Sequence, residues 1–240
     1  MNLDDNVSRS PRPAPPSPAE VARREGFQHV YHLLHVGNLP SVASGGLMSR
    51  TALEEAGIKT ASLQSPVVRA ERARNLVLPD GTERSLDSFL PLRWDPRTPV
   101  LANLAYDWET GRYRLDRQEY LVIMVCNVEA LNTATGLWFA TGHPFASRTG
   151  ILEASQWTDM PWDDLRRGRQ PAANQPAPAA EGELLFDGRI DPSYFIYGAV
   201  CCDESQVRAQ TLAPDLPIRM VREFFFGEQE SISYTMANSS

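Results

Sequence analysis

The strongest constraint on the fold is an uninterrupted β-prone run at residues 119–128, EYLVIMVCNV. Its centre, residues 121–126, carries no charged or amide side chain, so a strand there is apolar on both of its faces. A strand of that kind has to be buried from both sides. The rest of the chain must therefore supply packing layers above and below it.

Several other segments of the chain read as regular elements. Residues 28–35 are β-prone, and a period of two separates their side chains into two groups, with His29, Tyr31, Leu33 and His35 on one face and Val30, His32 and Leu34 on the other. Further strands are expected at 137–143, 181–186, 196–202 and 218–226, an irregular strand and turn at 89–101, and helices at 41–43, 51–56, 157–169, 203–212 and after Pro66. These elements follow no regular βαβ rhythm, and no glycine-rich nucleotide fingerprint is present, so the expected class is α+β.

The two ends of the chain differ from its middle in composition. Residues 1–22 are rich in Pro and Ser and are expected to be a disordered leader, with order beginning near Phe27. A single domain is expected over 23–228, followed by a disordered tail at 229–240. Three cysteines without a disulfide or zinc spacing favour a reducing compartment. No signal peptide and no apolar run of membrane-spanning length is apparent, so we expect a cytoplasmic protein that does not cross a membrane.

Charge limits the possible nucleic-acid partners. A formal net charge of −7 argues against a histone-like grip on duplex nucleic acid, which needs many cationic phosphate contacts. A local basic cluster remains at Arg69, Arg72 and Arg74, where Arg69 and Arg72 share one face of a helix that starts at Pro66. Two interpretations stay open: a solvated helix face, or a local contact with an anion or nucleic acid.

Three histidines recur at a spacing of three residues, His29, His32 and His35. In a strand this spacing sends neighbouring members of the series to opposite faces, so the three rings do not converge. No metal site is therefore expected.

Two acidic residues stand at the entrance of the strand expected at 181–186. Glu181 and Glu183 are two apart and share a face, and a Pro/Ala-rich loop at 170–180 leads into them. Paired carboxylates can perform acid–base chemistry or stabilise a positive charge that develops at a sugar carbon. They can equally be the solvated entrance of a strand.

In order and spacing, several of these segments resemble the DarT toxins over roughly residues 27–226. The DarT toxins are ADP-ribosyltransferases of a bacterial toxin–antitoxin system that modify bases in single-stranded DNA with NAD. The resemblance is carried by Tyr31-His-Leu-Leu-His35-x-x-Asn38-Leu39, Gly46-Leu47, Phe89-Leu-Pro-Leu-Arg-Trp-Asp-Pro-Arg-Thr-Pro-Val-Leu101, the strand 120–128, Trp138-Phe-Ala-Thr-Gly-His143, Gly182-Glu-Leu-Leu185 and Val200-Cys-Cys-Asp-Glu-Ser-Gln-Val207.

The resemblance implies a split β-sheet core with flanking helices, NAD in the cleft as co-substrate, no metal, and Glu183 as the catalytic glutamate. It also implies that a carboxylate on the ribose 2′-hydroxyl stabilises an oxocarbenium-like ribose, and that Arg72 takes part in catalysis at the target base. The residues implied for NAD are Tyr31, His32, His35, Asn38 and Arg97, and those implied for DNA are Arg69, Arg74 and Arg93. The implied partners are single-stranded DNA and an antitoxin with a macrodomain that removes the ADP-ribose.

The sequence departs from the family pattern in two informative places. Pro91-Leu-Arg-Trp94 replaces an aromatic Pro-Phe-Tyr-Phe segment, which changes the wall of the pocket. Glu181 stands where the family tends to carry Gln, so the acceptor could be a base other than thymine. Two alternatives therefore remain: an ADP-ribosyltransferase with a protein arginine or RNA acceptor, and a binding module for a nucleotide or a protein partner that performs no chemistry.

Overall fold

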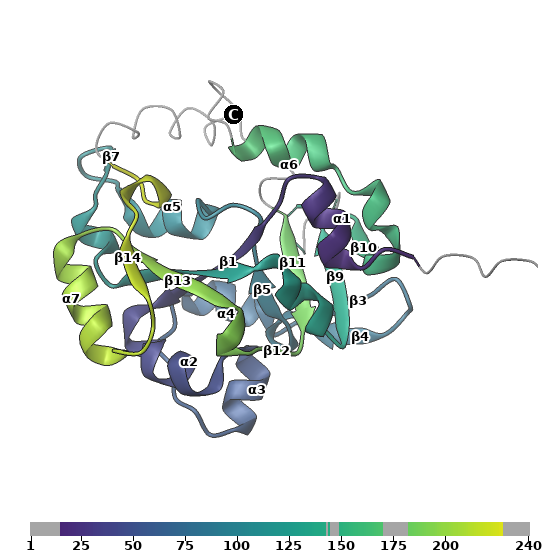
Figure 1. Ribbon diagram of the computed structural model, residues 1–240, viewed down its shortest axis with the longest axis horizontal. Coiled ribbons are helices and arrows are strands. Elements are labelled where there is room, and N and C mark those ends of the chain that lie inside the picture. Colours follow the sequence, from purple (N-terminus) through teal and green to yellow (C-terminus); the bar gives the residue numbers. More distant parts are fainter. Residues whose placement is uncertain (1–14, 143, 145–148, 170–181, 228–240) are drawn as a thin grey trace, which may run out of the picture.

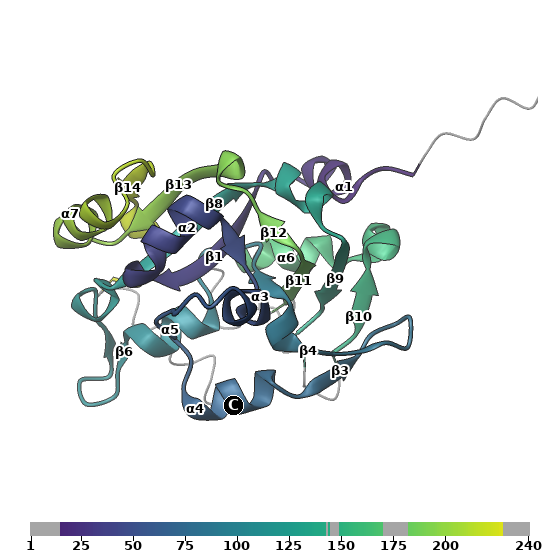
Figure 2. The ribbon, with the colours of Figure 1, turned by 90° about the horizontal axis from the view of Figure 1, so that it is seen from below.

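The computed structural model describes residues 15–142, 144, 149–169 and 182–227, and its centre consists of two four-stranded sheets (Figures 1 and 2). The first sheet has the order β1 (His29–His35), β8 (Leu121–Asn127), β13 (Phe195–Val200) and β14 (Ile218–Met220). The second has the order β10 (Ile151–Glu153), β9 (Gly136–Ala140), β11 (Glu183–Asp187) and β5 (Leu90–Leu92). This arrangement confirms the expected α+β class with a split-sheet core.

Strand β8 is buried on both faces, as its sequence predicts. Val122 and Met124 belong to one apolar core and Ile123 and Val125 to another on the opposite side of the sheet. The first core also holds residues of α2 (Leu39–Gly45), and the second holds residues of α5 (Pro99–Ala105). These helices supply the two covering layers that an apolar central strand requires.

The remaining elements surround the two sheets. Helix α7 (Asp203–Leu212) contacts β14 (Figure 1), and α1 (Pro18–Arg24) contacts the 3₁₀ helices η4 (Val128–Thr133) and η5 (Ala154–Asp159). The other α-helices are α3 (Arg50–Glu55), α4 (Pro66–Arg72) and α6 (Trp162–Arg169). Three two-stranded sheets pair β2 (Leu47–Met48) with β12 (Arg189–Ile190), β3 (Asn75–Val77) with β4 (Glu83–Ser85), and β6 (Tyr106–Asp107) with β7 (Arg112–Tyr113). The 3₁₀ turns are η1 (Val36–Asn38), η2 (Leu86–Ser88), η3 (Asp116–Gln118), η4 (Val128–Thr133), η5 (Ala154–Asp159), η7 (Pro192–Tyr194) and η8 (Arg222–Phe224).

The two large sheets are joined through their edge strands. The backbone N–H groups of Tyr31 and Arg93 each donate to the other residue's carbonyl oxygen at 2.9 Å. Close by, Nδ1 of His32 lies 2.8 Å from the carbonyl oxygen of Pro91. Residues just beyond β5 are therefore held against β1, and the side chains of both strands meet where the sheets come together.

Several boundaries differ from the sequence-based expectation. The helix expected from 157 begins at Trp162, after η5, and the strand expected to reach 143 ends at Ala140. Order begins before Phe27, because α1 starts at Pro18 under a capping box formed by Ser17 and Glu20, and its Ala19 and Ala22 are fully buried. The segment expected as irregular up to 101 contains the start of α5, where Thr98 caps the helix and a proline occupies its first turn. The last strand ends at Met220, and η8 follows it.

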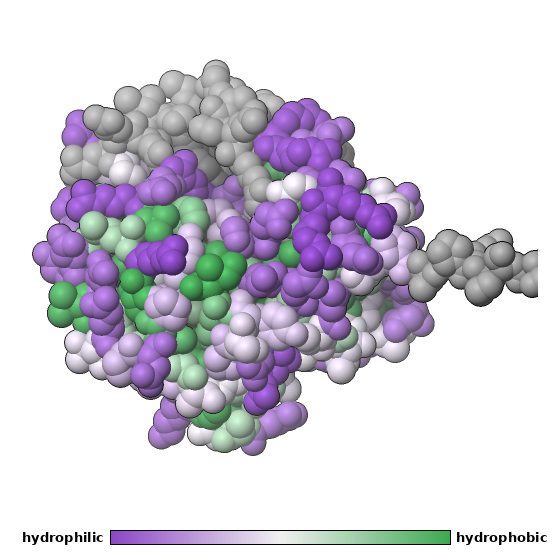
Figure 3. Space-filling view, viewed as in Figure 1, coloured by the Kyte–Doolittle hydropathy of each residue, from purple (hydrophilic) through white to green (hydrophobic). Residues whose placement is uncertain are grey.

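Apolar side chains also reach the surface. Val207, Leu212 and Met220 are exposed, and Figure 3 shows apolar side chains interspersed with polar ones over α7 and the neighbouring strands. The expectations for residues 1–14, for the tail at 229–240 and for the loop before β11, with Glu181, lie outside the described residues.

Candidate active site

Glu183 is a buried carboxylate at the start of β11, with 2% of its surface exposed. It shares a face with Leu185, which packs into a small apolar cluster with Leu78, Leu86 and Phe89. The carboxylate therefore points toward the β3–β4 hairpin and not into the main core. A charge this deeply buried is costly unless it is paired and hydrogen-bonded.

Two arginines supply that pairing. Nη1 of Arg72, at the end of α4, donates to both oxygens of Glu183 at 2.8 and 3.1 Å. Nη2 of Arg93 donates to Oε2 at 2.9 Å, and its Nη1 donates to the carbonyl oxygen of Gly182 at 2.8 Å. Charge-assisted hydrogen bonds of this length are the strong class. Glu183 is thus fixed by two guanidinium groups.

The position of Arg93 follows from the strand register. Leu184 of β11 lies opposite Leu92 of β5 in an antiparallel pair, so the residue after Leu92 faces the residue before Leu184. Arg93 and Glu183 are therefore cross-strand neighbours. Sequence analysis assigned Arg93 to DNA contact, whereas its side chain, with 17% exposed, lies on Glu183.

His32 lies on the same side of β1 as this cluster. Burial lowers the pKa of its imidazole and the nearby Arg72 guanidinium lowers it further, while the hydrogen bond to Pro91 and the charge of Glu183 act in the opposite direction. The ring is neutral near pH 7 as a result. A carbonyl oxygen only accepts, so Nδ1 carries the proton and Nε2 is left as an acceptor.

A narrow cavity opens beside His32. His32 and Asn38 line it together with residues of α2, β2 and α3, and its volume is about 70 Å³. Asn38 also holds the peptide of Ala61, through Nδ2 to the carbonyl oxygen at 2.9 Å and through the Ala61 N–H to Oδ1 at 2.8 Å. Pockets that enclose drug-sized ligands are typically several hundred Å³. The cavity is several-fold smaller than that, and both polar ends of the Asn38 amide are engaged by the Ala61 peptide.

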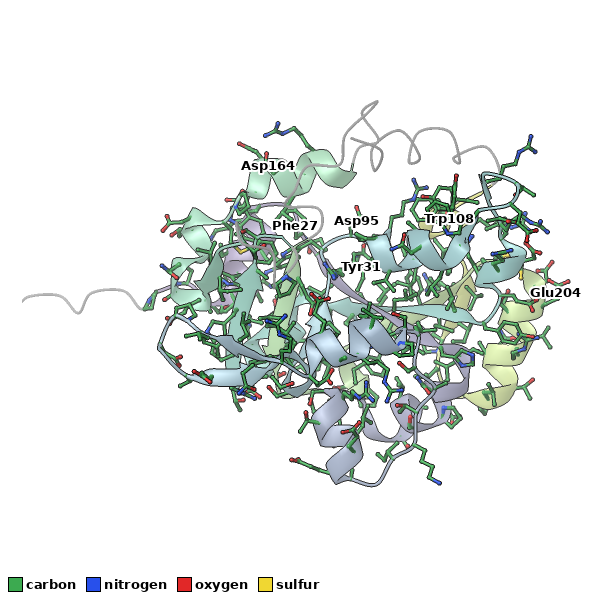
Figure 4. All side chains as sticks on the ribbon, turned by 180° about the vertical axis from the view of Figure 1, so that it is seen from behind. Phe27, Tyr31, Asp95, Trp108, Asp164 and Glu204 are labelled. Atoms are coloured by element: carbon green, nitrogen blue, oxygen red, sulfur yellow. The ribbon has the colours of Figure 1, made fainter. Side chains whose placement is uncertain are left out.

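The other residues implied for NAD lie across β1. The Tyr31 ring meets Phe224 edge-on at 5.7 Å, and His35 stacks on Tyr120 at 6.0 Å. Arg97 donates from Nε and Nη2 to the carbonyl oxygen of Glu223 at 2.9 and 2.6 Å. Figure 4 shows Tyr31 near the middle of the molecule, with Asp95, which accepts from the Arg97 N–H, close to it.

The alternation of β1 is the reason for this division. Residues 32 and 35 are separated by an odd number of positions, so only one of the two histidines can face Glu183. The structure brings together Glu183, Arg72, Arg93 and His32, with Asn38 at the adjoining cavity. It does not bring Tyr31, His35 or Arg97 to the carboxylate.

Arg69 and Arg74 lie near Arg72 on the outside of the molecule. Both are exposed, and α4 contains no buried residue. The helix that delivers Arg72 to the carboxylate thus presents Arg69 and the exposed Val67 to its surroundings.

Sequence analysis missed the residues that support Arg72. Ser85, Leu86 and Asp87 all contact or face it, and nothing in their local pattern signals such a role. Within the described ranges, no group of three His, Cys, Asp or Glu side chains is placed to hold a metal ion. None of the helices in those ranges has the length and apolar composition that a membrane crossing requires.

Comparison with solved structures shows where this fold occurs. Thermosipho africanus DarTG in complex with ADP-ribose is similar with a TM-score of 0.68 and 19% identity, covering 84% of this chain and 52% of that one. The present chain thus spans about half the length of the Thermosipho chain. Thermus sp. 2.9 DarT is similar in its complex with ADP-ribosylated single-stranded DNA, with a TM-score of 0.64, 13% identity and coverage of 84% and 97%. The same protein with NAD⁺ gives a TM-score of 0.60, 14% identity and coverage of 83% and 98%.

Sequence comparison identifies the family directly. A search of the curated proteins finds no match. The sequence model of DarT, described as an ssDNA thymidine ADP-ribosyltransferase, matches residues 31–226, which include every residue of the cluster around Glu183. The chain therefore belongs to the DarT family.

Proposed function

We propose that this protein transfers ADP-ribose from NAD to a base of single-stranded DNA, with Glu183 as the catalytic carboxylate. The observation that carries the proposal is the buried Glu183 held by Arg72 and Arg93 beside a neutral His32. Family membership supports the same reaction. A strand-entry charge without a catalytic role would be expected in solvent, so this burial argues against a silent binding module.

The chemistry follows from the position of the carboxylate. The bond between C1′ of the ribose and the nicotinamide nitrogen breaks, and the electron pair leaves with nicotinamide. A carboxylate that accepts a hydrogen bond from the ribose 2′-hydroxyl stabilises the oxocarbenium-like ribose that remains. A nucleophilic atom of the base then forms the new bond to C1′, and the base releases its proton. We assign the 2′-hydroxyl contact to Glu183.

The neighbouring residues divide the remaining tasks. His32 and Asn38 line the cavity beside β1, and Nε2 of the neutral His32 can accept a hydrogen bond from one end of NAD. Arg72 is the cation nearest to the reacting centre and suits an oxygen of the target base or a proton in transit. Tyr31, His35 and Arg97 would act from the far side of β1, by supporting the strand that carries His32.

Arg69 and Arg74 are proposed as phosphate contacts. Their exposure beside Arg72 gives a local cationic surface on a chain whose net charge is −7. Binding through a small number of phosphates weakens with salt in proportion to their number. Replacing both arginines by Gln should weaken oligonucleotide binding and flatten its salt dependence, measured by fluorescence anisotropy, while the affinity for NAD stays unchanged.

The proposal also covers the acceptor of ADP-ribose and the biological role of the protein. The family description names thymidine, whereas the argument for another base or for a protein or RNA acceptor depends on Glu181, outside the described residues. We further propose that the protein is a toxin that acts in the cytoplasm and is paired with an antitoxin, as its membership of the DarT family suggests. The resemblance in sequence implies that this antitoxin carries a macrodomain.

The decisive experiment is mass spectrometry of four base-biased DNA oligonucleotides after incubation with NAD. Wild type should add one ADP-ribose to one base, and Glu183→Gln should lower the rate by about 100- to 1000-fold, the typical cost of losing one transition-state contact of this kind. The exposed Glu109 provides the matched control, and Glu109→Gln should retain full activity. If NAD binds but no strand gains mass, DNA is not the acceptor and the proposal is wrong.

A further inference from the structure

Arg72 is held on the side away from Glu183 by three consecutive residues, Ser85, Leu86 and Asp87. Its Nη2 donates to the carbonyl oxygen of Leu86 at 3.2 Å, and its Nε lies 3.8 Å from Oδ1 of Asp87. The hydroxyl of Ser85 donates to the backbone carbonyl of Arg72 at 3.0 Å. Each guanidinium nitrogen of Arg72 therefore faces its own acceptor, since Nη1 is bound to Glu183.

Asp87 sits between two arginines. Its Oδ2 lies 4.0 Å from Nε of Arg50, and Arg50 also binds Glu54 at 2.8 Å. The Asp87 side chain is 16% exposed, and its backbone N–H donates to the hydroxyl of Ser85 at 3.2 Å. Opposite charges thus alternate from the exposed Glu54 inward through Arg50, Asp87 and Arg72 to Glu183. Arg50 therefore offsets only part of the Asp87 charge, and Asp87 can still attract the Arg72 guanidinium when the contact of Arg72 with Glu183 is lost.

The segment that supports Arg72 is itself tied to the strand that carries Glu183. Arg84, next to Ser85, binds Asp187 at the far end of β11. The Arg84 guanidinium also lies over the Phe89 ring at 4.4 Å from its centroid. Both ends of β11 are therefore connected to residues 84–87. A displacement of this segment would change the position of Arg72 relative to the carboxylate.

We propose that Asp87 is a positioning residue, which keeps the Arg72 guanidinium in place when the ribose hydroxyl of NAD engages Glu183. The inference rests on the proposed function, because it concerns the state in which NAD is bound at Glu183. A hydroxyl that binds Glu183 competes with Arg72 for the same two oxygens. A long side chain that loses that partner regains rotamer freedom unless a second acceptor holds it. Asp87 is the charged group placed to do so.

The kinetic test compares Asp87→Asn with Glu83→Gln, because Glu83 is an exposed acidic residue of the neighbouring strand β4. Asp87→Asn should lower kcat by about 10-fold, because misplacement of a catalytic group by a fraction of an ångström is costly, and should leave KM for NAD within about twofold. Glu83→Gln should change neither constant. Asp87→Glu, which keeps the charge, should recover most of the rate.

A double-mutant cycle separates positioning from a general structural effect. In an Arg72→Gln background, Asp87→Asn should alter kcat by less than about twofold, because its effect passes through Arg72. A full 10-fold loss in that background, or a loss that appears in KM instead of kcat, would overturn the proposal.

A spectroscopic measurement tests the contact independently of activity. The Arg72 Nε–H signal in a ¹⁵N spectrum can be assigned by its absence from Arg72→Lys. In Asp87→Asn it should shift and exchange faster with solvent, and in Glu83→Gln it should not. An unchanged signal would show that Asp87 does not hold Arg72. If wild type modifies no oligonucleotide, the proposed function is wrong. The Arg72 Nε–H signal would still show whether Asp87 holds Arg72.

Discussion

Replacement of Arg93 by Met measures how strongly the ion pair with Glu183 stabilises the folded protein. The substitution removes the hydrogen bonds from Arg93 to Glu183 at 2.9 Å and to the Gly182 carbonyl oxygen at 2.8 Å. It keeps an unbranched apolar stem. It also leaves the backbone pair between Arg93 and Tyr31, so the connection between the two sheets is kept.

The expected loss of unfolding free energy depends on the bonds that Glu183 keeps after the substitution. Breaking a buried ion pair outright typically costs about 3–5 kcal/mol, and a single hydrogen bond to a charged group contributes about 1.5–3 kcal/mol. Glu183 keeps both bonds to Arg72, and Arg93 is 17% exposed, so the lower end of these ranges applies. We expect a loss of about 2 kcal/mol, which a domain with about 5–15 kcal/mol of stability tolerates. The melting temperature should fall by about 4–8 °C.

Urea denaturation followed by circular dichroism provides the assay. The matched control is Arg189→Met, since Arg189 has 58% of its side chain exposed and stands 3.7 Å from Asp191. This variant should change the free energy of unfolding by less than about 0.5 kcal/mol. The double variant with Glu183→Gln should lose less than the sum of the single variants, because they share one interaction. Additive losses, or an Arg93→Met variant as stable as the control, would refute the reasoning.

Three further results are expected. Folding lowers the pKa of His32, so the unfolded chain binds more protons and the free energy of unfolding should decline as the pH falls below 6.5. Denaturation of His32→Gln at a series of pH values should lack this part of the decline. The same dependence of unfolding free energy on pH in both proteins would contradict the prediction. Gly46→Ala should lower the free energy of unfolding by about 3 kcal/mol in urea denaturation, because φ is +80° and a Cβ would lie 2.2 Å from the Ile190 carbonyl oxygen. Gly57→Ala should lower it by only about 1 kcal/mol, because φ is +69° there and a Cβ would meet no neighbouring atom. Equal losses in the two variants would contradict this. Burial raises the pKa of the Cys126 thiol to about 12, so iodoacetamide near pH 8 should label it only after unfolding, as peptide mass spectrometry can show; rapid labelling of the folded protein would contradict this.

Periodicity predicted the central strands of the first sheet well because both faces of these strands are packed against apolar cores. In β8 every side chain from 121 to 126 is apolar, and in β1 the alternation correctly separates Val30 and Leu34 from Tyr31. The same alternation indicated that His32 and His35 face opposite ways. It could not indicate which of them faces Glu183, because that depends on which side of β1 the second sheet packs.

The missed elements had readable local signals. Ser17, Pro18 and Glu20 form a capping box with proline in the first turn, and Thr98 followed by Pro99 is also a helix start. In both places the proline lies in the first helical turn, where it does not interrupt the helix. The contacts around Arg72 are a different case. Arg72 and Glu183 are 111 positions apart, and Arg93 reaches Glu183 only through the register of β5 and β11. No local pattern encodes such a pairing.

Counting charges around Glu183 explains why a neutral histidine suits this site. Arg72 and Arg93 carry two positive charges, and Glu183 and Asp87 carry two negative ones, so the cluster is formally neutral. In the proposed reaction, departure of nicotinamide leaves one positive charge on the ribose. A protonated His32 would place a second positive charge near it, and in a poorly solvated cleft that repulsion would oppose the reaction. Burial and the Arg72 guanidinium lower the pKa of His32 and so keep this charge away. Arg72, which binds the Glu183 carboxylate, thereby adds to the effect of burial in keeping the imidazole neutral.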